Sequence, residues 1–105
     1  MKHLLYSKIR GTSYTQELVK TLKLGEELNL VRDPGNQYDP NCISANSVDG
    51  KVGYIGKDLA KTLAPLMDSG TTLCCFVTAI TGGNNGYCFG VNIEIFKTEE
   101  SKGAL

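Results

Sequence analysis

The sequence has few of the residues that mark several common classes of protein. It contains no tryptophan, one histidine and three prolines, and its eleven basic residues balance eleven acidic ones. A balanced charge does not indicate a protein that binds any polyanion regardless of sequence, although it leaves room for a local basic patch. The single histidine, His3, lies at the start of the chain and would have to serve every catalytic role. We therefore expect no Ser–His–Asp or Cys–His site and no enzyme activity.

The chain also lacks long apolar runs and the spacings of metal ligands. No stretch approaches the length of a membrane span, and the apolar run at the start is too short for a signal peptide. No Cys-x-x-Cys pair occurs, so a zinc site is not expected. All four cysteines lie in β-like runs, which favours free thiols in the core over a metal or a disulfide. They are Cys42, Cys74, Cys75 and Cys88. We expect a soluble, cytoplasmic protein without metal or cofactor.

Side-chain chemistry is concentrated in residues 28–57. Residues 33–36, Asp-Pro-Gly-Asn, have the composition of a turn, and the proline that follows Asp39 favours an extended conformation for that residue. Asp-Gly at positions 49 and 50 joins two alternating runs and predicts a type I′ turn. Residues 42–55 are therefore expected to form a β-hairpin.

Strands are predicted on both sides of this stretch. Alternation of apolar and polar residues predicts them at residues 5–9, 27–32, 73–81 and 87–97.

Helical spacing is clearest at residues 57–67, which predict one helix. Pro65 cannot donate a hydrogen bond to the preceding turn, so a kink or a restart is expected near Ala64. Residues 16–24 fit either one or two helical turns or a strand, and their pattern leaves both open.

Five or six short strands with one clear inserted helix predict a mainly β (α+β) fold. A nearly all-β chain of this length hides its sheet edges by closing into a small barrel, and the expected arrangement is OB-like. Residues 1–97 are expected to form this single domain. Residues 98–105 are small and polar and predict a disordered C-terminal tail.

Four motifs, taken in order, resemble a known family. They are Gly-Thr-Ser-Tyr at 11–14, Leu-Val-Arg-Asp-Pro-Gly-Asn-Gln-Tyr-Asp-Pro-Asn at 30–41, Gly-Lys-Val-Gly-Tyr-Ile-Gly-Lys at 50–57, and a late Gly-Val-Asn-Ile. Their order and spacing resemble the HIRAN domain over about residues 6–97. This OB-like module occurs at the front of SWI/SNF-type DNA translocases and as a stand-alone bacterial or phage protein, the type that this chain resembles.

The resemblance implies a module that binds single-stranded DNA, in particular its 3′ end, without catalysis of its own. Tyr38 and Asp39 match the pair that contacts the terminal nucleotide and its 3′-hydroxyl. The implied DNA-binding residues are Ser13, Tyr14, Asn36, Tyr38, Asp39, Tyr54, Lys57 and Tyr87. In this resemblance Tyr14 lines the pocket, and Asn36 is a polar loop residue beside it. Tyr54 and Lys57 face the DNA, with Lys57 placed for a phosphate, and a base stacks on Tyr87.

The chain departs from the family at Ser13. Members that bind DNA ends have an arginine there, so this chain lacks a bidentate clamp for a phosphate. Lys8, Arg10 and Arg32 are the candidates to supply the missing charge.

The same residues suit a single-strand binder without the family. Such a protein needs aromatic faces for bases and scattered cations for phosphates. The carboxylate of Asp39 would repel a phosphate but can accept a hydrogen bond from a terminal hydroxyl. In the competing interpretation, Asn36 and Asp39 only cap loop backbone, and Tyr6 and Tyr54 are half-buried strand residues.

Two functions therefore follow from the sequence. The first is a DNA-end-binding module accessory to DNA repair or replication, with a helicase or nuclease as a candidate partner. The second is a protein-interaction barrel that uses the loop at 36–41 and the helix at 59–67 as a docking surface.

Overall fold

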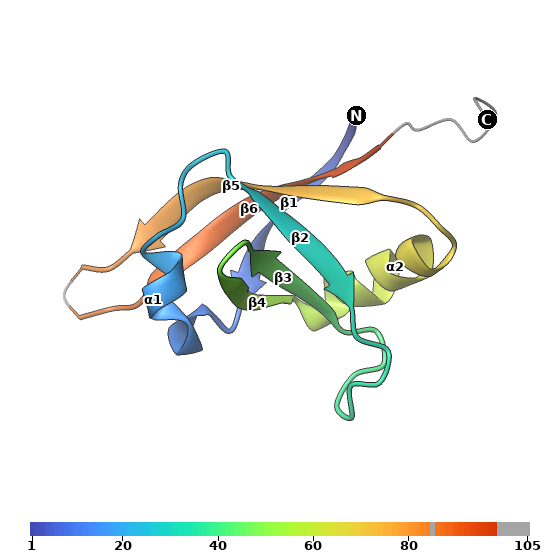
Figure 1. Cartoon of the computed structure of the whole chain (residues 1–105), viewed down its shortest axis with the longest axis horizontal. Coiled ribbons are helices and arrows are strands. Elements are labelled where there is room, and N and C mark those ends of the chain that lie inside the picture. The colour runs from blue at the N-terminus through green and yellow to red at the C-terminus, as the bar shows by residue number, and fades with distance from the viewer. Residues whose placement is uncertain (85, 99–105) are drawn as a thin grey trace.

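The computed structural model describes residues 1–84 and 86–98. Six antiparallel strands close into a barrel in the order β1-β4-β3-β2-β5-β6 (Figure 1). The strands are β1 (Lys2–Arg10), β2 (Glu27–Arg32), β3 (Ile43–Ser47), β4 (Gly50–Ile55), β5 (Leu73–Gly82) and β6 (Phe89–Lys97). The helical elements are the 3-10 turn η1 (Thr12–Tyr14), the short α1 (Gln16–Val19) and α2 (Lys57–Asp68). The predicted mainly β barrel with one clear inserted helix is confirmed.

Alternation along the strands places one apolar face of each inside the barrel. Cys75 and Val77 of β5 are buried opposite Ile95 and Ile93 of β6, their partners in the sheet register. Helix α2 adds Leu63 and two alanines to the same core. Each fully buried aliphatic side chain of this kind contributes about 1.5–3 kcal/mol, so the core fixes the barrel on which the loops are mounted.

The ambiguous stretch at residues 16–24 forms one helical turn followed by a loop. The hydroxyl of Thr15 donates to the carbonyl oxygen of Val52, which ties this segment to β4. Gly25 has a φ of 84°, a left-handed conformation that glycine adopts without strain, and there the chain turns into β2.

Of the predicted kink or restart near Ala64, helix α2 shows no restart. The helix continues to Asp68, and the carbonyl of Pro65 accepts a hydrogen bond from Ser69 N at 3.0 Å. The bond that Pro65 cannot make would have gone to the carbonyl of Lys61, which lies on the exposed side of the helix where water reaches it.

The predicted hairpin at residues 42–55 is confirmed, but its turn is shifted by one residue. Ser47 already pairs with Gly50, so the two loop residues are Val48 and Asp49. The hydroxyl of Ser47 accepts a hydrogen bond from Asp49 N at 3.1 Å. This local hydroxyl contact stabilises a turn that the Asp-Gly signal alone does not predict.

The cysteines are free thiols, as expected, but not all are in the core. Cys42 and Cys75 are buried, and burial raises the pKa of the Cys75 thiol to about 12. The prediction was wrong for Cys88, which is exposed because β6 begins only at Phe89. Among residues 1–84 and 86–98, no group of three or more histidine, cysteine or acidic side chains could hold a metal ion.

Two further expectations concern the ends of the fold and the membrane. Of the predicted tail, Thr98 donates its backbone N–H to the carbonyl of Thr72 at 3.1 Å, and residues 99–105 lie outside the described residues. None of the helices described is long and apolar enough to cross a membrane.

Candidate nucleic-acid interface

The loop between β2 and β3 is held in shape by its own polar groups. The N–H of Asp33 donates to the carbonyl of Cys42 at 2.9 Å and closes the loop at its base. The side-chain oxygen of Asn36 accepts the N–H groups of Tyr38 and Asp39 at 2.9 and 3.0 Å. One carboxylate oxygen of Asp39, Oδ1, accepts the N–H of Asn41 at 2.9 Å. The interpretation of Asn36 and Asp39 as caps of loop backbone is therefore correct.

Two groups of this loop remain available to a ligand after the backbone is capped. Tyr38 is 81% exposed, and its backbone N–H is fixed by the bond to Asn36. No described residue donates a hydrogen bond to the second carboxylate oxygen of Asp39, Oδ2. The loop thus presents an aromatic face and a free acceptor from a fixed backbone.

A pocket of about 360 Å³ lies where this loop meets the end of β4 and the start of α2. This volume is within the range of about 300–1,000 Å³ that is usual for small-ligand sites. It contains five of the eight predicted residues together with Cys42 and Ile55. The five are Asn36, Tyr38, Asp39, Tyr54 and Lys57. We call it the end pocket.

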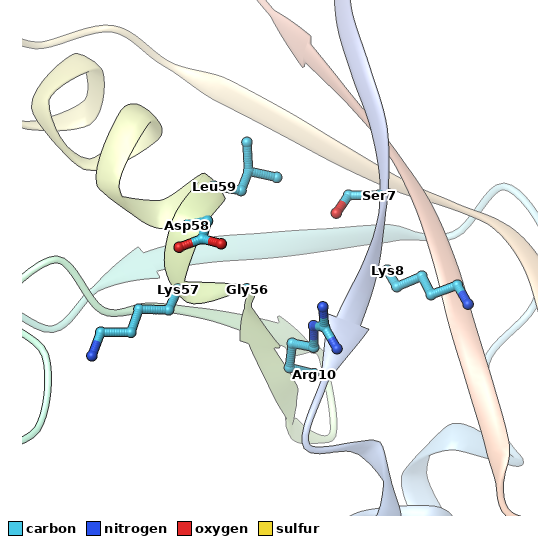
Figure 2. A pocket seen from close by; sticks show the side chains of 7 residues that line it. All are labelled: Ser7, Lys8, Arg10, Gly56, Lys57, Asp58 and Leu59. Carbon is cyan, nitrogen blue, oxygen red and sulfur yellow. The ribbon is translucent and has the colours of Figure 1, made fainter.

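Lys57 enters the end pocket from the first residue of α2. In Figure 2 its side chain extends away from Gly56 and the β1 strand. A cation at a helix N-terminus is unfavourable for the helix dipole, so its position there is more readily explained by a negatively charged partner.

Tyr54 is held by a cation that the sequence did not indicate. Lys51 donates from Nζ to the Tyr54 hydroxyl at 2.9 Å and lies 4.8 Å from the ring centroid. The hydrogen bond to Tyr54 raises the pKa of the Lys51 ammonium. Regular alternation would place residues three apart on opposite faces, but the register shifts between Ala45 and Asn46, and this adds one residue on β4. No sequence pattern reveals that irregularity.

Ser13 and Tyr14 are not among the residues that line the end pocket. They belong to the turn η1, and Tyr14 is 91% exposed. The turn begins at Gly11, where an added Cβ would lie 3.7 Å from Cδ2 of Tyr54. Gly11 thus approaches Tyr54, whereas the turn η1 itself packs against β6 and α1.

Tyr87 is separate from the end pocket. It is 76% exposed in the β5–β6 connection, which Figure 1 shows at the left end of the barrel, away from the β2–β3 loop. The side chain of Gln16 bonds both the N–H and the carbonyl of Phe89, at 2.8 and 3.0 Å, and so ties the start of β6 to α1. Of the four predicted tyrosines, Tyr38 and Tyr54 line this pocket, and Tyr14 and Tyr87 do not.

Comparison with known families agrees with this architecture. The model of the HIRAN domain matches residues 2–95. This chain belongs to the HIRAN domain family. The human helicase-like transcription factor is 36% identical to it over 81 residues, which are 76% of this chain and 8% of that protein. A Fanconi-associated nuclease 1 homolog from Oryza sativa is 39% identical over 51 residues, or 45% of this chain and 5% of that protein. The HIRAN domain thus corresponds to less than a tenth of these relatives.

Solved structures show the same HIRAN fold. A crystallised protein from Lactobacillus plantarum superposes with a TM-score of 0.79 at 28% identity, covering 91% of this chain and 93% of that one. The crystal structure of the HIRAN domain of human HLTF gives 0.66 at 30% identity, with 95% and 80% covered. The NMR structure of that domain in its DNA-bound conformation gives 0.59 at 29% identity, with 98% and 84% covered.

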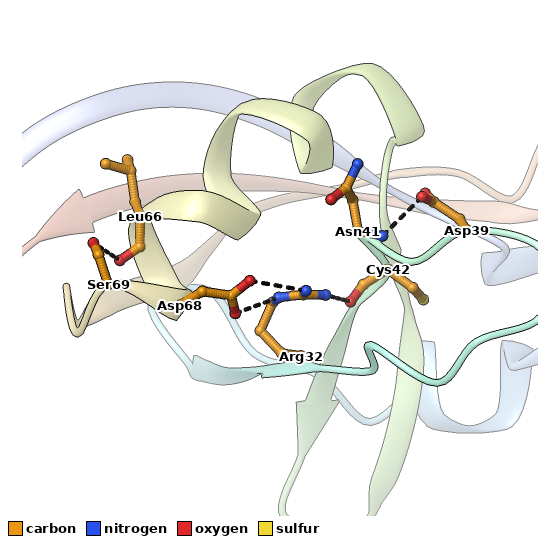
Figure 3. Close-up of polar contacts among 7 residues, drawn as sticks. All are labelled: Arg32, Asp39, Asn41, Cys42, Leu66, Asp68 and Ser69. Carbon is orange, nitrogen blue, oxygen red and sulfur yellow. Dashed lines mark hydrogen bonds and ion pairs between the residues drawn. The ribbon is translucent and has the colours of Figure 1, made fainter.

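In this HIRAN domain Arg32 cannot replace the arginine that is absent at position 13. Its guanidinium binds both carboxylate oxygens of Asp68, at 2.9 and 3.1 Å, and donates to the carbonyl of Cys42 at 2.9 Å (Figure 3). The ion pair raises the pKa of Arg32 and lowers that of the Asp68 carboxyl. Arg32 therefore joins the base of the β2–β3 loop to the end of α2, and Lys8 and Arg10 remain as sources of charge.

Proposed function

We propose that this HIRAN domain binds single-stranded DNA and holds the 3′ end of the strand in the end pocket. The observation that carries the proposal is the meeting of an exposed ring, a carboxylate with a free oxygen and a lysine in one pocket. The DNA-bound conformation solved for the HIRAN domain of HLTF supports it, because that domain is 29% identical over nearly the whole chain.

Each group in the end pocket has a distinct task in this proposal. The ring of Tyr38 stacks on the terminal base, an interaction of about 1–3 kcal/mol per base. Lys57 neutralises the phosphate on the 5′ side of that nucleotide. Oδ2 of Asp39 accepts a hydrogen bond from the 3′-hydroxyl, since an ionised carboxylate can only accept.

Asp39 also makes the pocket selective for a free hydroxyl. A 3′-phosphate would bring negative charge against the carboxylate, and like charges close together repel strongly where water is partly excluded. Because Oδ1 is already bonded to Asn41 N, the carboxylate cannot swing away without losing the cap of the loop. The hydrogen bond to Asn41 therefore keeps the carboxylate in the position where it would repel a 3′-phosphate.

Fluorescence anisotropy with oligonucleotides that end in a 3′-hydroxyl or a 3′-phosphate tests the proposal. The native protein should bind the hydroxyl end at least about tenfold more tightly, equivalent to about 1.4 kcal/mol. Asp39→Asn keeps an oxygen for Asn41 N but removes the charge, so the two ends should bind nearly equally. Equal binding by the native protein would reject recognition of the end.

An RNA strand with the same bases extends this test to the type of nucleic acid. The proposal for DNA predicts weaker binding of RNA, whose terminal 2′-hydroxyl adds bulk beside the sugar that Asp39 contacts. RNA binding as tight as DNA binding would show that the pocket does not distinguish the two.

The alternative function, a protein-docking barrel, requires the helix at 59–67 to present an apolar surface to a partner. Leu63 is buried in the core, and the other apolar residues of α2 pack against that core. The apolar side of the helix is therefore used within the domain. Because related domains belong to a helicase-like factor and to nuclease homologs, we propose that this domain serves DNA repair or replication beside an enzyme of that kind.

A further inference from the structure

The outer face of β1 carries a row of exposed polar side chains that leads to the end pocket. Tyr6, Lys8 and Arg10 are exposed at every second position, while Ile9 points into the core. Arg10 pairs with Tyr54 in the β1–β4 register. Paired residues of neighbouring antiparallel strands share a face, so the row continues into the candidate interface.

Two further hollows follow this row and join it to the end pocket. The larger, of about 530 Å³, lies between β1 and the start of α2 and shares Lys57 with the end pocket. A shallower one of about 260 Å³ shares Ser7 and Lys8 with the larger and is also lined by Tyr6. The three hollows therefore form a connected series along the surface.

The cations in this series are spread along a line. Figure 2 shows the guanidinium of Arg10 beside Gly56, with the side chains of Lys57 and Lys8 extending to opposite sides. The Nε of Arg10 lies 3.4 Å from the position of a Cβ on Gly56, so a glycine there lets the arginine lie close over the helix start. A spread row matches a polymer with repeated charges better than one isolated anion, which would be held by converging groups.

These cations are not neutralised by acidic side chains of the described residues. Within residues 1–84 and 86–98, none of Lys8, Arg10 and Lys57 forms an ion pair. Asp58 also lines the larger hollow, in the first turn of α2, where its charge favours the helix dipole. The helix start has no side-chain cap, so its backbone N–H groups add to the positive potential there.

The far end of the row presents an aromatic face. Tyr6 is 68% exposed, which overturns the interpretation that it is half-buried. Its ring centroid lies 4.7 Å from that of His3, and Glu94, its partner in the β1–β6 register, raises the pKa of the tyrosine. The ring is thus held in place on the surface.

We propose that this row binds the strand upstream of the end held in the end pocket. Lys57 contacts the first phosphate, Arg10 and Lys8 contact the following ones, and Tyr6 stacks on a base beyond them. Lys8 and Arg10 are about 7 Å apart along the strand, a separation that long side chains adjust to successive phosphates. Arg10 thus adds a guanidinium to the path of the upstream strand and not to the site of the terminal nucleotide. This inference rests on the proposed function and adds the direction in which the strand leaves the pocket.

The test compares a dinucleotide with an octanucleotide, both with a 3′-hydroxyl, in competition with a fluorescent strand. The native protein should bind the octanucleotide at least about tenfold more tightly, because charged contacts accumulate along the strand. The double variant Lys8→Gln with Arg10→Gln keeps the aliphatic stems. It should lose most of this gain while its binding of the dinucleotide changes by less than about threefold.

Salt dependence gives a second readout. Log affinity for the octanucleotide decreases with log salt concentration. The magnitude of this slope should be smaller by about 1.4 in the Lys8 and Arg10 variant than in the native protein, since each of the two lost phosphate contacts on a single strand contributes about 0.7. The matched control is Lys23→Gln with Lys97→Gln, which removes the same charge from exposed positions outside all three hollows.

Failure of this inference can be distinguished from failure of the proposed function. If the octanucleotide gain persists in the Lys8 and Arg10 variant, or the control loses as much, the strand does not follow β1 and the inference is overturned. If the native protein does not distinguish a 3′-hydroxyl from a 3′-phosphate on the dinucleotide, the proposed function fails instead. Thermal unfolding of both double variants verifies that the barrel is intact.

Discussion

The β2–β3 loop and the β5–β6 connection share several residue types but differ in structure. Both contain glycine, asparagine and one tyrosine, and in both a cysteine is the last residue before the next strand. In the β2–β3 loop, side-chain oxygens of Asn36 and Asp39 fix the backbone and expose Tyr38 over a pocket. Gly82 at the end of β5 and Gly83 and Gly86 in the β5–β6 connection have positive φ angles. There Tyr87 is joined to the turn by a backbone hydrogen bond to Asn84.

The difference shows that composition alone does not decide whether side chains fix the backbone of a loop. An asparagine that accepts two N–H groups orders the side chains around it, whereas glycines allow a turn without ordering any side chain. Preorganisation of this kind reduces the entropy lost on binding. We therefore expect ligand binding to depend on the β2–β3 loop and only weakly on the β5–β6 connection.

The largest expected effect separates the two tyrosines. Tyr38→Ala should weaken binding of single-stranded DNA by about 1–3 kcal/mol, because it removes the stacking face of the end pocket. Tyr87→Ala is the matched control and should cost less than about 0.5 kcal/mol, as for a surface substitution away from the site. Anisotropy titrations measure both. A greater loss of affinity with Tyr87→Ala than with Tyr38→Ala would show that binding depends on the β5–β6 connection and not on the β2–β3 loop.

A smaller effect separates the two asparagines. Asn36→Ala removes the acceptor for two backbone N–H groups and should weaken DNA binding about tenfold, since each hydrogen bond contributes about 0.5–1.5 kcal/mol. Asn84→Ala leaves the hydrogen bond from Tyr87 N intact, because that bond goes to the backbone carbonyl. Its affinity should therefore be unchanged. Equal losses in the two variants would show that the hydrogen bonds of Asn36 do not matter for binding.

The smallest effect concerns acid. Because Arg32 lowers the pKa of the Asp68 carboxyl below its usual 3.8, the ion pair stabilises the folded state above that value. This stabilisation is lost as the pH falls through the lowered pKa of the folded protein. The difference in free energy of unfolding between the native protein and Asp68→Asn should be constant near neutral pH and shrink below about pH 4. Chemical denaturation across this range measures it, and a difference that grows in acid would contradict the assigned ion pair.

Much of the barrel could be predicted from the sequence because strands and helix faces depend on local periodicity. Residues 27–32 form the strand expected of them, and the apolar side of the helix at 57–67 packs on the core. The turn of the β3–β4 hairpin was shifted by the hydroxyl of Ser47, a contact that competes with the Asp-Gly signal. Local patterns thus predict elements better than their end residues.

The candidate site was less predictable because it is a tertiary feature. The resemblance to the HIRAN domain, not periodicity, related Tyr38 and Asp39 to Lys57, and the structure brings these three residues into one pocket. Lys51 was missed because a register irregularity turns it to Tyr54. Arg32 was considered for the DNA, but it is bound to Asp68, a partner 36 residues away that no local pattern indicates.

An NMR titration with a short oligonucleotide that ends in a 3′-hydroxyl tests the central claim most directly. The account predicts that the backbone amide signals of Tyr38, Asp39 and Lys57 shift most, and that those of the β5–β6 connection change little. A strand with a 3′-phosphate should produce the same pattern only at much higher concentration. Shifts confined to the β5–β6 connection, or identical titrations with the two ends, would contradict the claim that the β2–β3 loop forms the site for the end of the strand.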